Sequence, residues 1–393
     1  MAAAVAVSAP AVSAAAAETA EMRGLWVECQ GSNDTLVSKE KISGMFNRAA
    51  SSNINAVFLQ VHRGNKAWFR SSFADSGPCE SFRKKYGIDP LTFSIEEAHA
   101  RGIEIHAWVN VYRILKNMRA PILKRIGRGA ITCDGKGKSL LSYPPKKLPD
   151  GGYWLDPGDG RVNEYLLKLV GELAGRYPKL DGIHLDFVRY PSPGSSGAGS
   201  LFSGGNDFGY GTRAVAAFKA KSGLNPLKMK KNRENCELWD GWRRDRVTDF
   251  VRAAGRRLRK INPKMQLSAA VFASAGRAYS EYFQDWRRWM EDGLLDFVAP
   301  MNYTIDSRMM KYRTKVAVSS AGGRRACIGL GAYLLTNKPS ALLAQIRDVR
   351  SLGAGGVILF SYDAMLKRQS IFSLLKQRVF SRSCPPPPST RKK

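Results

Sequence analysis

The sequence predicts an α/β protein: a (β/α)8 TIM barrel with long insertions after its third and fourth strands. Three observations lead to this fold class: eight short β-rich runs, helical patterns between them, and two connections too long for one helix each. Because parallel strands need crossover connections, the alternation of strand and helix indicates a parallel sheet. Eight such units close a barrel. An open doubly wound sheet is the alternative, but no G-x-G-x-x-G follows the first strand.

The predicted strands are short runs rich in β-branched and aromatic residues. In chain order they are Arg23–Glu28, Asn55–His62, Ile103–Asn110, Gly182–Tyr190, Gln266–Phe272, Asp296–Tyr303, Ala326–Tyr333 and Gly356–Tyr362. Trp26 and Phe58, in the first two runs, are expected to pack inside the barrel.

Helical patterns separate these runs, and several stop at a glycine, as at Arg101-Gly102 and Leu352-Gly353. The predicted helices are Ser38–Ser51, Pro90–Ala100, Arg161–Arg176, Asp240–Lys260, Glu281–Asp292 and Ser340–Ser351. The long connections Val111–Asp181 and Pro191–Met265 carry Gly-, Ser-, Pro- and Lys-rich insertions. Insertions on this face of a barrel build its cleft, so Arg113–Asp150 and Pro191–Gly211 are expected to form cleft walls.

The two ends of the chain differ in composition from the barrel, which is expected over residues 21–380. Residues 1–20 are almost all Ala, Val and Ser and resemble the apolar part of a secretory signal. They lack a basic start, so a disordered leader is the alternative. Residues 381–393 combine a polyproline run with basic residues, which is typical of a disordered tail. The sequence predicts export to the periplasm or the cell exterior.

The overall composition is that of an ordinary globular protein, with 44% hydrophobic and 24% charged residues. This excludes a mostly disordered or collagen-like chain. No run approaches the roughly 20 apolar residues that a transmembrane segment needs. The charge is unusual: 62 Lys and Arg against 33 Asp and Glu give +29. Such an excess predicts salt-sensitive contact with polyanions such as acidic wall polymers. No helix-turn-helix or RNA-binding motif supports a specific nucleic-acid function.

Polar and aromatic residues gather at the predicted carboxyl ends of the strands, where TIM barrels place their active sites. The candidate catalytic residues are Asp186 and Glu28, and the candidate substrate-binding residues are Gln60, Arg63, His106, Trp108, Asn110, His184, Arg189, Tyr190, Asn302, Tyr303, Tyr333, Tyr362 and Asp363. Strand side chains alternate with period two, so His106, Trp108 and Asn110 share one face. His184 and Asp186 share another. Tyr303 and Tyr333 are equally compatible with packing and with substrate contact.

These residue types suit carbohydrate chemistry, because aromatic faces stack on sugars while amides and arginines bind hydroxyls. Glycoside cleavage usually needs two carboxyl groups. Phosphoryl transfer would need a loop that cradles phosphate groups, and the sequence shows no such loop. His62, His106 and His184 are conceivable metal ligands, but hydrogen-bonded histidines inside the barrel are the favoured interpretation. None of the six cysteines lies in a C-x-x-C pair. The sequence therefore predicts no metal and no cofactor.

Several long motifs resemble a known family. In order from about Met22 to Asp363 they are MRGLWVE, DPLTFSIEEAHARGIEIHAWVNVYR, WLDPGDGRVNEYL, DGIHLDFVRYP, FQDWRRWMEDGLLDFVAPMNY and GVILFSYD. They closely resemble the glycosyl-hydrolase-like 10 family, once catalogued as a domain of unknown function. The resemblance implies a TIM-barrel, glycosidase-like domain of bacterial proteins that are often exported. At least one relative acts on peptidoglycan glycan strands stripped of their peptides.

The same resemblance bears on individual residues. It implies that Asp186 lies where related barrel glycosidases place a nucleophile, and that Glu28 replaces an Asp found in many members. Asn65 stands where the family resemblance implies Asp, and Met301 stands where other branches carry Gln. These departures put the substrate in doubt more than the fold.

The sequence thus predicts an exported glycoside hydrolase acting on a polymeric glycan, with peptidoglycan as first candidate. The alternative is a catalytically weak or inactive barrel that binds glycans or the cell wall. In the catalytic interpretation Asp186 attacks or stabilises the anomeric carbon, and a neighbouring Arg189 lowers its pKa. Glu28 is the expected partner. If its strand lies too far across the barrel, Asp363 or a carboxylate of an insertion replaces it.

Overall fold

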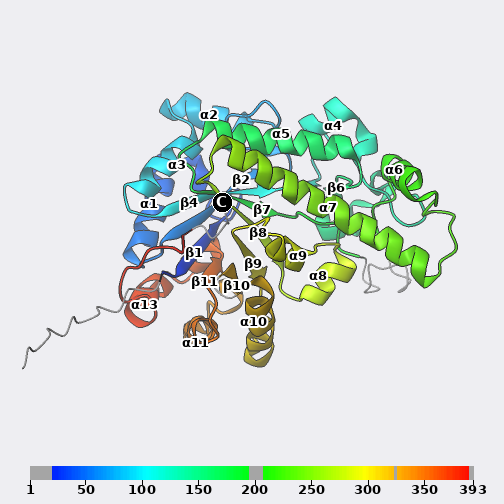
Figure 1. Ribbon diagram of the computed structural model, residues 1–393. Helices are drawn as coiled ribbons and strands as arrows, with labels where there is room; N and C mark the ends of the chain where they lie inside the picture. Colours follow the sequence, from blue (N-terminus) through cyan, green and yellow to red (C-terminus); the bar gives the residue numbers. More distant parts are fainter. Residues whose placement is uncertain (1–19, 194–206, 323–324, 389–393) are drawn as a thin grey trace, which may run out of the picture.

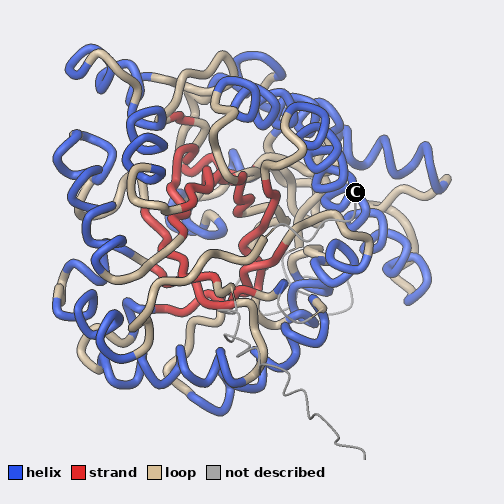
Figure 2. The backbone as a smooth tube through the Cα atoms, turned by 60° about the vertical axis from the view of Figure 1, so that its left-hand side comes forward, coloured by secondary structure: helices blue, strands red, loops and turns tan. Residues whose placement is uncertain are grey.

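The computed structural model describes residues 20–193, 207–322 and 325–388 of the 393-residue chain. At its centre, eight parallel strands form a closed barrel surrounded by helices (Figure 1, Figure 2). The barrel strands are β1 (Met22–Val27), β2 (Ala56–Arg63), β4 (Glu104–Asn110), β7 (Gly182–Asp186), β8 (Gln266–Phe272), β9 (Phe297–Met301), β10 (Cys327–Gly331) and β11 (Gly356–Phe360). The predicted TIM barrel is confirmed.

The barrel closes because β1 pairs with β11 on one side and with β2 on the other. Leu25, for example, lies beside both Leu359 and Val57. A short strand β3 (Lys66–Ala67) pairs antiparallel with the end of β2. The fourth predicted strand is too long: β7 ends at Asp186, because the next residue, Phe187, adopts a left-handed φ of 49° and turns the chain away.

The helices cover the outside of the barrel. They are α1 (Lys39–Ser51), α2 (Gly77–Tyr86), α3 (Pro90–His99), α4 (Pro121–Ile126), α5 (Gly160–Arg176), α6 (Thr212–Ser222), α7 (Arg233–Ile261), α8 (Ala275–Glu281), α9 (Trp286–Glu291), α10 (Ser307–Ala321), α11 (Pro339–Ser351), α12 (Tyr362–Leu366) and α13 (Ser370–Arg378). The prediction of one helix over Glu281–Asp292 is wrong. The Asp285 side chain caps a new helix, α9, and Phe283 has a positive φ of 53° that interrupts the pattern.

The connections after β4 and β7 contain the predicted insertions, and their described parts contact each other. In the first, β5 (Arg113–Leu115) pairs with β6 (Tyr153–Trp154). Asp134, in the first connection, forms an antiparallel bridge with Phe208, in the second. Much of Pro191–Gly211, predicted to form a cleft wall, lies outside the described residues.

Among the described residues, apolar side chains pack in three regions: inside the barrel, between the barrel and its helices, and in a smaller cluster around α6 and the start of α7. The interior cluster consists of Met22, Trp26, Ala56, Phe58, Trp108, Ala270, Phe297, Ala299, Cys327 and Ile358. Trp26 and Phe58 therefore pack inside the barrel as predicted. In the part of the chain that the structure describes, no helix is both long and apolar enough to cross a membrane.

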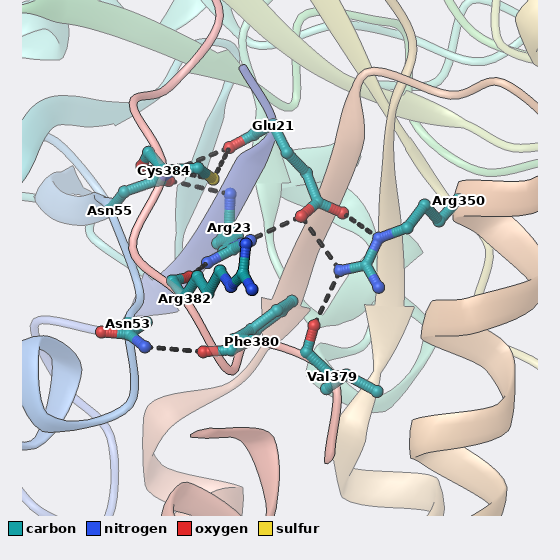
Figure 3. Close-up of polar contacts among 9 residues, drawn as sticks. All are labelled: Glu21, Arg23, Asn53, Asn55, Arg350, Val379, Phe380, Arg382 and Cys384. Carbon is teal, nitrogen blue, oxygen red and sulfur yellow. Dashed lines mark hydrogen bonds and ion pairs between the residues drawn. The ribbon is translucent and has the colours of Figure 1, made fainter. Parts of the chain in front are cut away.

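The described ends of the chain meet at the amino-terminal edge of the barrel (Figure 3). Glu21, just before β1, accepts hydrogen bonds from Arg23 and Arg350, each at 2.9 Å. Asn55 donates to the backbone oxygen of Cys384 at 3.0 Å. These contacts fix the end of the described chain on the face opposite the carboxyl ends of the strands.

Candidate active site

A cavity of about 330 Å³ opens at the carboxyl ends of the barrel strands. Among its lining residues are eight of the predicted site residues: Glu28, Gln60, Arg63, Trp108, Asn110, Asp186, Arg189 and Tyr303. Trp26, Arg113, Phe187, Ala270, Met301 and Phe360 complete the lining. Two carboxyl groups, Glu28 and Asp186, thus face one cavity from strands on different sides of the barrel.

Asp186, the last residue of β7, is held by two N–H donors. The Trp108 indole donates to Oδ2 at 3.0 Å, and the Phe187 backbone N–H donates to Oδ1 at 2.7 Å. Burial nevertheless raises the pKa of Asp186, although these donors and the charges of Arg189 and Arg113 act to lower it. The expectation that Arg189 lowers this pKa below its ordinary value is therefore wrong, because desolvation outweighs the arginine.

Glu28 follows β1, and its side chain is 24% exposed. It pairs with Arg63, whose Nη1 lies 3.5 Å from Oε1, and it accepts a hydrogen bond from Ser361 at 3.5 Å. Burial raises the pKa of Glu28; Arg63 lowers it and the charge of Asp363 raises it. Both cavity carboxyls therefore hold protons more tightly than in water.

One wall of the cavity combines arginines with aromatic rings. The guanidinium of Arg189 lies 5.2 Å from the centre of the Phe187 ring and 3.3 Å from Asp150 Oδ2. Arg113 lies over the same ring at 4.8 Å and donates to the backbone oxygen of Asp150. The insertion after β4 thus reaches the cavity through Arg113, and its Asp150 contacts both arginines of this wall.

The opposite wall is aromatic. Tyr303, after β9, stacks on Phe360 at the end of β11, with ring centres 5.5 Å apart and planes 17° apart. Tyr333 lies at the rim, 46% exposed, and contacts Tyr303 at 5.9 Å. Burial raises the pKa of Tyr303, and the charges of Asp186 and Glu28 both add to the rise. Tyr303 therefore lies within electrostatic reach of both carboxyls.

The prediction that His106 and His184 lie at the mouth of the cleft is wrong. The strand register places His106 beside Gly182, the first residue of β7, so it lies deep in the barrel and stacks on Phe58 at 4.7 Å. His184 lies next to Ser268, whose hydroxyl is 2.8 Å from Nδ1. Its Nε2 accepts from the Trp26 indole at 3.2 Å. Both histidines pack the interior instead of facing the cavity.

Four more predicted residues are not among those that line the cavity. Tyr190 is fully buried and packs against Phe283 at 5.4 Å. Asn302 donates to the Met310 carbonyl of α10 at 2.9 Å. The remaining two follow β11: Tyr362 packs on a ring of α13, and Asp363 accepts from the Asn33 backbone N–H at 2.5 Å. Each tethers a helix or loop, so their expected role in substrate binding is corrected to a structural one.

Arg113, Phe187 and Phe360 line the cavity but escape the strand-end argument. That argument selects polar side chains and the aromatic residues with a polar group, Trp and Tyr, so it misses Phe360, an apolar strand terminus. Arg113 lies beyond β4 in an insertion, and only its position three residues after Asn110 could have indicated it. Within the described ranges, no group of three or more His, Cys, Asp or Glu side chains could hold a metal ion.

Solved structures share the fold of this chain. The glycoside hydrolase domain of PgaB (BpsB) from Bordetella bronchiseptica is 14% identical, with a TM-score of 0.65 over 91% of this chain and 99% of that domain. The catalytic domain of a β-amylase from Paenibacillus polymyxa is 13% identical, with a TM-score of 0.60 over 93% of this chain and 100% of that one. At these identities the likeness concerns the fold alone.

Curated relatives are similar over about two thirds of the chain. Glycosyl hydrolase DigH of Escherichia coli K12 is 27% identical over 274 residues, which is 65% of this chain and 56% of that protein. Glycosyl hydrolase YngK of Bacillus subtilis is 25% identical over 277 residues, which is 64% of this chain and 46% of that protein. The chain therefore spans about half the length of these relatives. The model of the family described as "Glycosyl hydrolase-like 10" matches residues 21–321, and the chain belongs to this family.

Proposed function

We propose that this protein is a glycoside hydrolase that cleaves a polymeric glycan, with peptidoglycan glycan strands as the first candidate substrate. The observation that carries the proposal is the pair of carboxyl groups, Glu28 and Asp186, on one cavity. Two carboxyl groups beside one sugar are what most glycosidases use. The fold shared with glycoside hydrolases and the family membership support the same reaction class.

Asp186 is the proposed group that attacks or stabilises the anomeric carbon. Its two oxygens each accept one N–H bond, and both bonds favour the ionised form. Glu28 is the proposed acid and base. Its burial keeps a proton on the carboxyl at higher pH than in water, which suits an acid that protonates a leaving group. The arginines and rings of the cavity walls would bind and orient the sugar.

The test is incubation of the protein with peptide-free glycan strands and a panel of neutral and acidic polysaccharides, followed by mass analysis of the products. Asp186→Asn should reduce turnover at least about a hundredfold, since a catalytic carboxyl contributes on that order or more. Asp245→Asn is the matched control. Asp245 is 39% exposed, pairs with Arg288 at 3.0 Å and belongs to α7 on the outside of the barrel, so the same chemical change should leave turnover unaltered.

The result also separates the proposal from its alternative, a glycan-binding barrel without activity. Binding of a glycan by the wild type without any cleavage would favour that alternative. Cleavage that survives Asp186→Asn within about tenfold would reject the catalytic assignment.

Export and wall contact are further parts of the proposal. The Ala- and Val-rich stretch 1–20 supports export, and the net charge of +29 supports contact with acidic polymers. Fractionation of cells expressing the natural gene tests export, and a mature protein in the cytosol that keeps Met1 would contradict it. Wall contact predicts that the protein elutes from purified wall material as salt rises.

A further inference from the structure

We infer that Tyr333 forms a second sugar-binding subsite outside the cavity, so that the protein binds a glycan chain along the β9–β10 side of the mouth. The inference rests on the proposed function and deepens it. It assigns an extended substrate, in which one sugar occupies the cavity and a neighbouring unit of the same chain lies on the Tyr333 ring.

The first support is the position of Tyr333. It follows β10 directly, in a short 3-10 helix, Ala332–Leu334, at the carboxyl end of the barrel. It is 46% exposed, although it is a large aromatic residue. Its ring is nearly perpendicular to those of Tyr303, at 5.9 Å and 86°, and Phe360, at 6.0 Å and 89°. An exposed ring held by two others is pre-ordered, so binding a sugar costs it little conformational entropy.

The second support is a continuous series of rings from the surface to the cavity floor. Tyr333 contacts Tyr303 and Phe360, which both line the cavity. Phe360 in turn contacts Trp26 at 6.1 Å and Trp108 at 6.4 Å. Trp108 donates to Asp186. A chain leaving the carboxyl groups on this side therefore meets aromatic surface without interruption.

The third support is the backbone that carries the ring. A Cβ atom at Gly331 would lie 3.2 Å from Tyr333 Cε1 and 3.3 Å from Tyr303 Cβ, closer than ordinary contacts. The absence of a side chain at Gly331 thus leaves room for the Tyr333 ring beside Tyr303. Leu334 and Ile305, 40% and 72% exposed, extend the apolar rim on the loops after β10 and β9. Apolar surface suits the C–H faces of a sugar chain.

The chain also provides a matched control in Tyr312. It is more exposed than Tyr333, at 66%, but it belongs to the second turn of α10. Among the described rings, it has none of the contacts that join Tyr333 to the cavity. Loss of its ring removes a similar exposed surface from a position outside the proposed path.

The experiment measures kcat and KM for defined oligosaccharides of increasing length, prepared from a glycan that the wild type cleaves. Tyr333→Ala should raise KM for long oligosaccharides about three- to tenfold, the effect of losing one aromatic contact, and leave kcat nearly unchanged. The shortest cleaved oligosaccharide should be unaffected. Tyr333→Phe, which keeps the ring, should restore the wild-type KM, and Tyr312→Ala should equal the wild type at all lengths. Tyr333→Leu, which keeps apolar contact with Tyr303 but no flat ring, should behave like Tyr333→Ala.

Three results would overturn the inference while leaving the proposed function intact: equal loss on short and long substrates, no loss in either Tyr333→Ala or Tyr333→Leu, or an equal loss in Tyr312→Ala. If instead the wild type neither binds nor cleaves any glycan of the panel, the proposed function fails and the subsite fails with it.

Discussion

The indole N–H of Trp108 and the carboxylate of Asp186 form a 3.0 Å hydrogen bond between neighbouring strands at the floor of the cavity. In the register of β4 and β7, Asp186 lies beside Asn110, so Trp108 reaches it from two residues earlier on the same strand face. The bond joins the aromatic lining to one of the two cavity carboxyls. Burial raises the pKa of this carboxyl, and Trp108 is among the groups that limit the rise.

Trp108→Phe should therefore shift the pH dependence of activity. The substitution keeps a ring but removes the donor, so the pKa of Asp186 rises further and the ionised form appears only at higher pH. Loss of a hydrogen bond to a charged group is worth about 1.5–3 kcal/mol, or about one to two pH units. The acid limb of the pH profile of kcat/KM should therefore move to higher pH by about one to two units. Trp289→Phe is the control, since it removes an indole donor that bonds Thr248 outside the barrel, and an equal shift there would contradict the prediction.

Arg63→Gln should shift the alkaline limb of the pH profile of kcat/KM. Arg63 lowers the pKa of Glu28, whose carboxyl must be protonated to act as an acid. Without this cation, the Glu28 carboxyl loses its proton only at higher pH, so the alkaline limb should move to higher pH. Arg83→Gln removes an exposed cation that pairs with Glu80 in α2 and should leave the profile unchanged. A downward shift in Arg63→Gln would contradict the assignment of Glu28 as the acid.

The barrel could be predicted from sequence because its strands and crossovers repeat in chain order. Strand ends were less predictable. The run through Tyr190 remains β-rich, and only the left-handed backbone at Phe187 ends β7 at Asp186. Similarly, the helical pattern across Glu281–Asp292 conceals a break that depends on the cap at Asp285.

The candidate site could be predicted in part, because period-two alternation gives the face of a strand but not the depth of a residue along the barrel. Trp108 and His106 share a face, yet His106 lies two residues closer to the amino-terminal edge and packs on Phe58. Arg113 and Phe187 reach the cavity through backbone turns and an insertion. Neither feature has a period, so the sequence pattern does not indicate where these side chains point.

Arg189→Lys should reduce stability even though it conserves charge. The planar guanidinium pairs with Asp150 at 3.3 Å and packs among four rings, with distances to the ring centres between 4.7 and 5.2 Å: Trp154, Phe187, Phe272 and Tyr282. An ammonium cannot stack in this way. We expect the free energy of unfolding to fall by about 1–2 kcal/mol in chemical denaturation. Arg252→Lys, at an arginine on α7 whose side chain is 28% exposed, should change it by less than about 0.5 kcal/mol, and equal losses would refute the argument.

His62 gives the last prediction, because it is a histidine that burial keeps neutral, although its hydrogen bond to Asn110 acts to raise its pKa. It is 1% exposed, its Nδ1 lies 2.8 Å from the Asn110 carbonyl oxygen, and its Nε2 lies 3.3 Å from the Asn65 amide nitrogen. Since the carbonyl only accepts and the amide nitrogen only donates, Nδ1 carries the proton and Nε2 accepts. Burial lowers the pKa of His62 from 6.5 to about 4. Between pH 6.5 and 4, His62 binds a proton in the unfolded chain but stays neutral in the folded chain. The free energy of unfolding is therefore not reduced by His62 above pH 6.5. It declines as the pH falls from 6.5 toward 4, by about 3 kcal/mol in total.

Asn65→Asp should remove most of that decline. A carboxylate opposite Nε2 favours the doubly protonated imidazole, so the pKa of His62 should rise toward or above 6.5 and the folded chain then takes up the proton as readily as the unfolded one. Imidazole proton resonances report the pKa, and denaturation at intervals from pH 8 to 4 reports the stability. Asn53→Asp is the control, because its amide likewise donates to a backbone carbonyl, that of Phe380, in this case with no described hydrogen bond to a histidine. If Asn65→Asp retains the wild-type decline between pH 6.5 and 4, another group is responsible for it and the neutral His62–Asn65 pair does not set the acid stability of the fold.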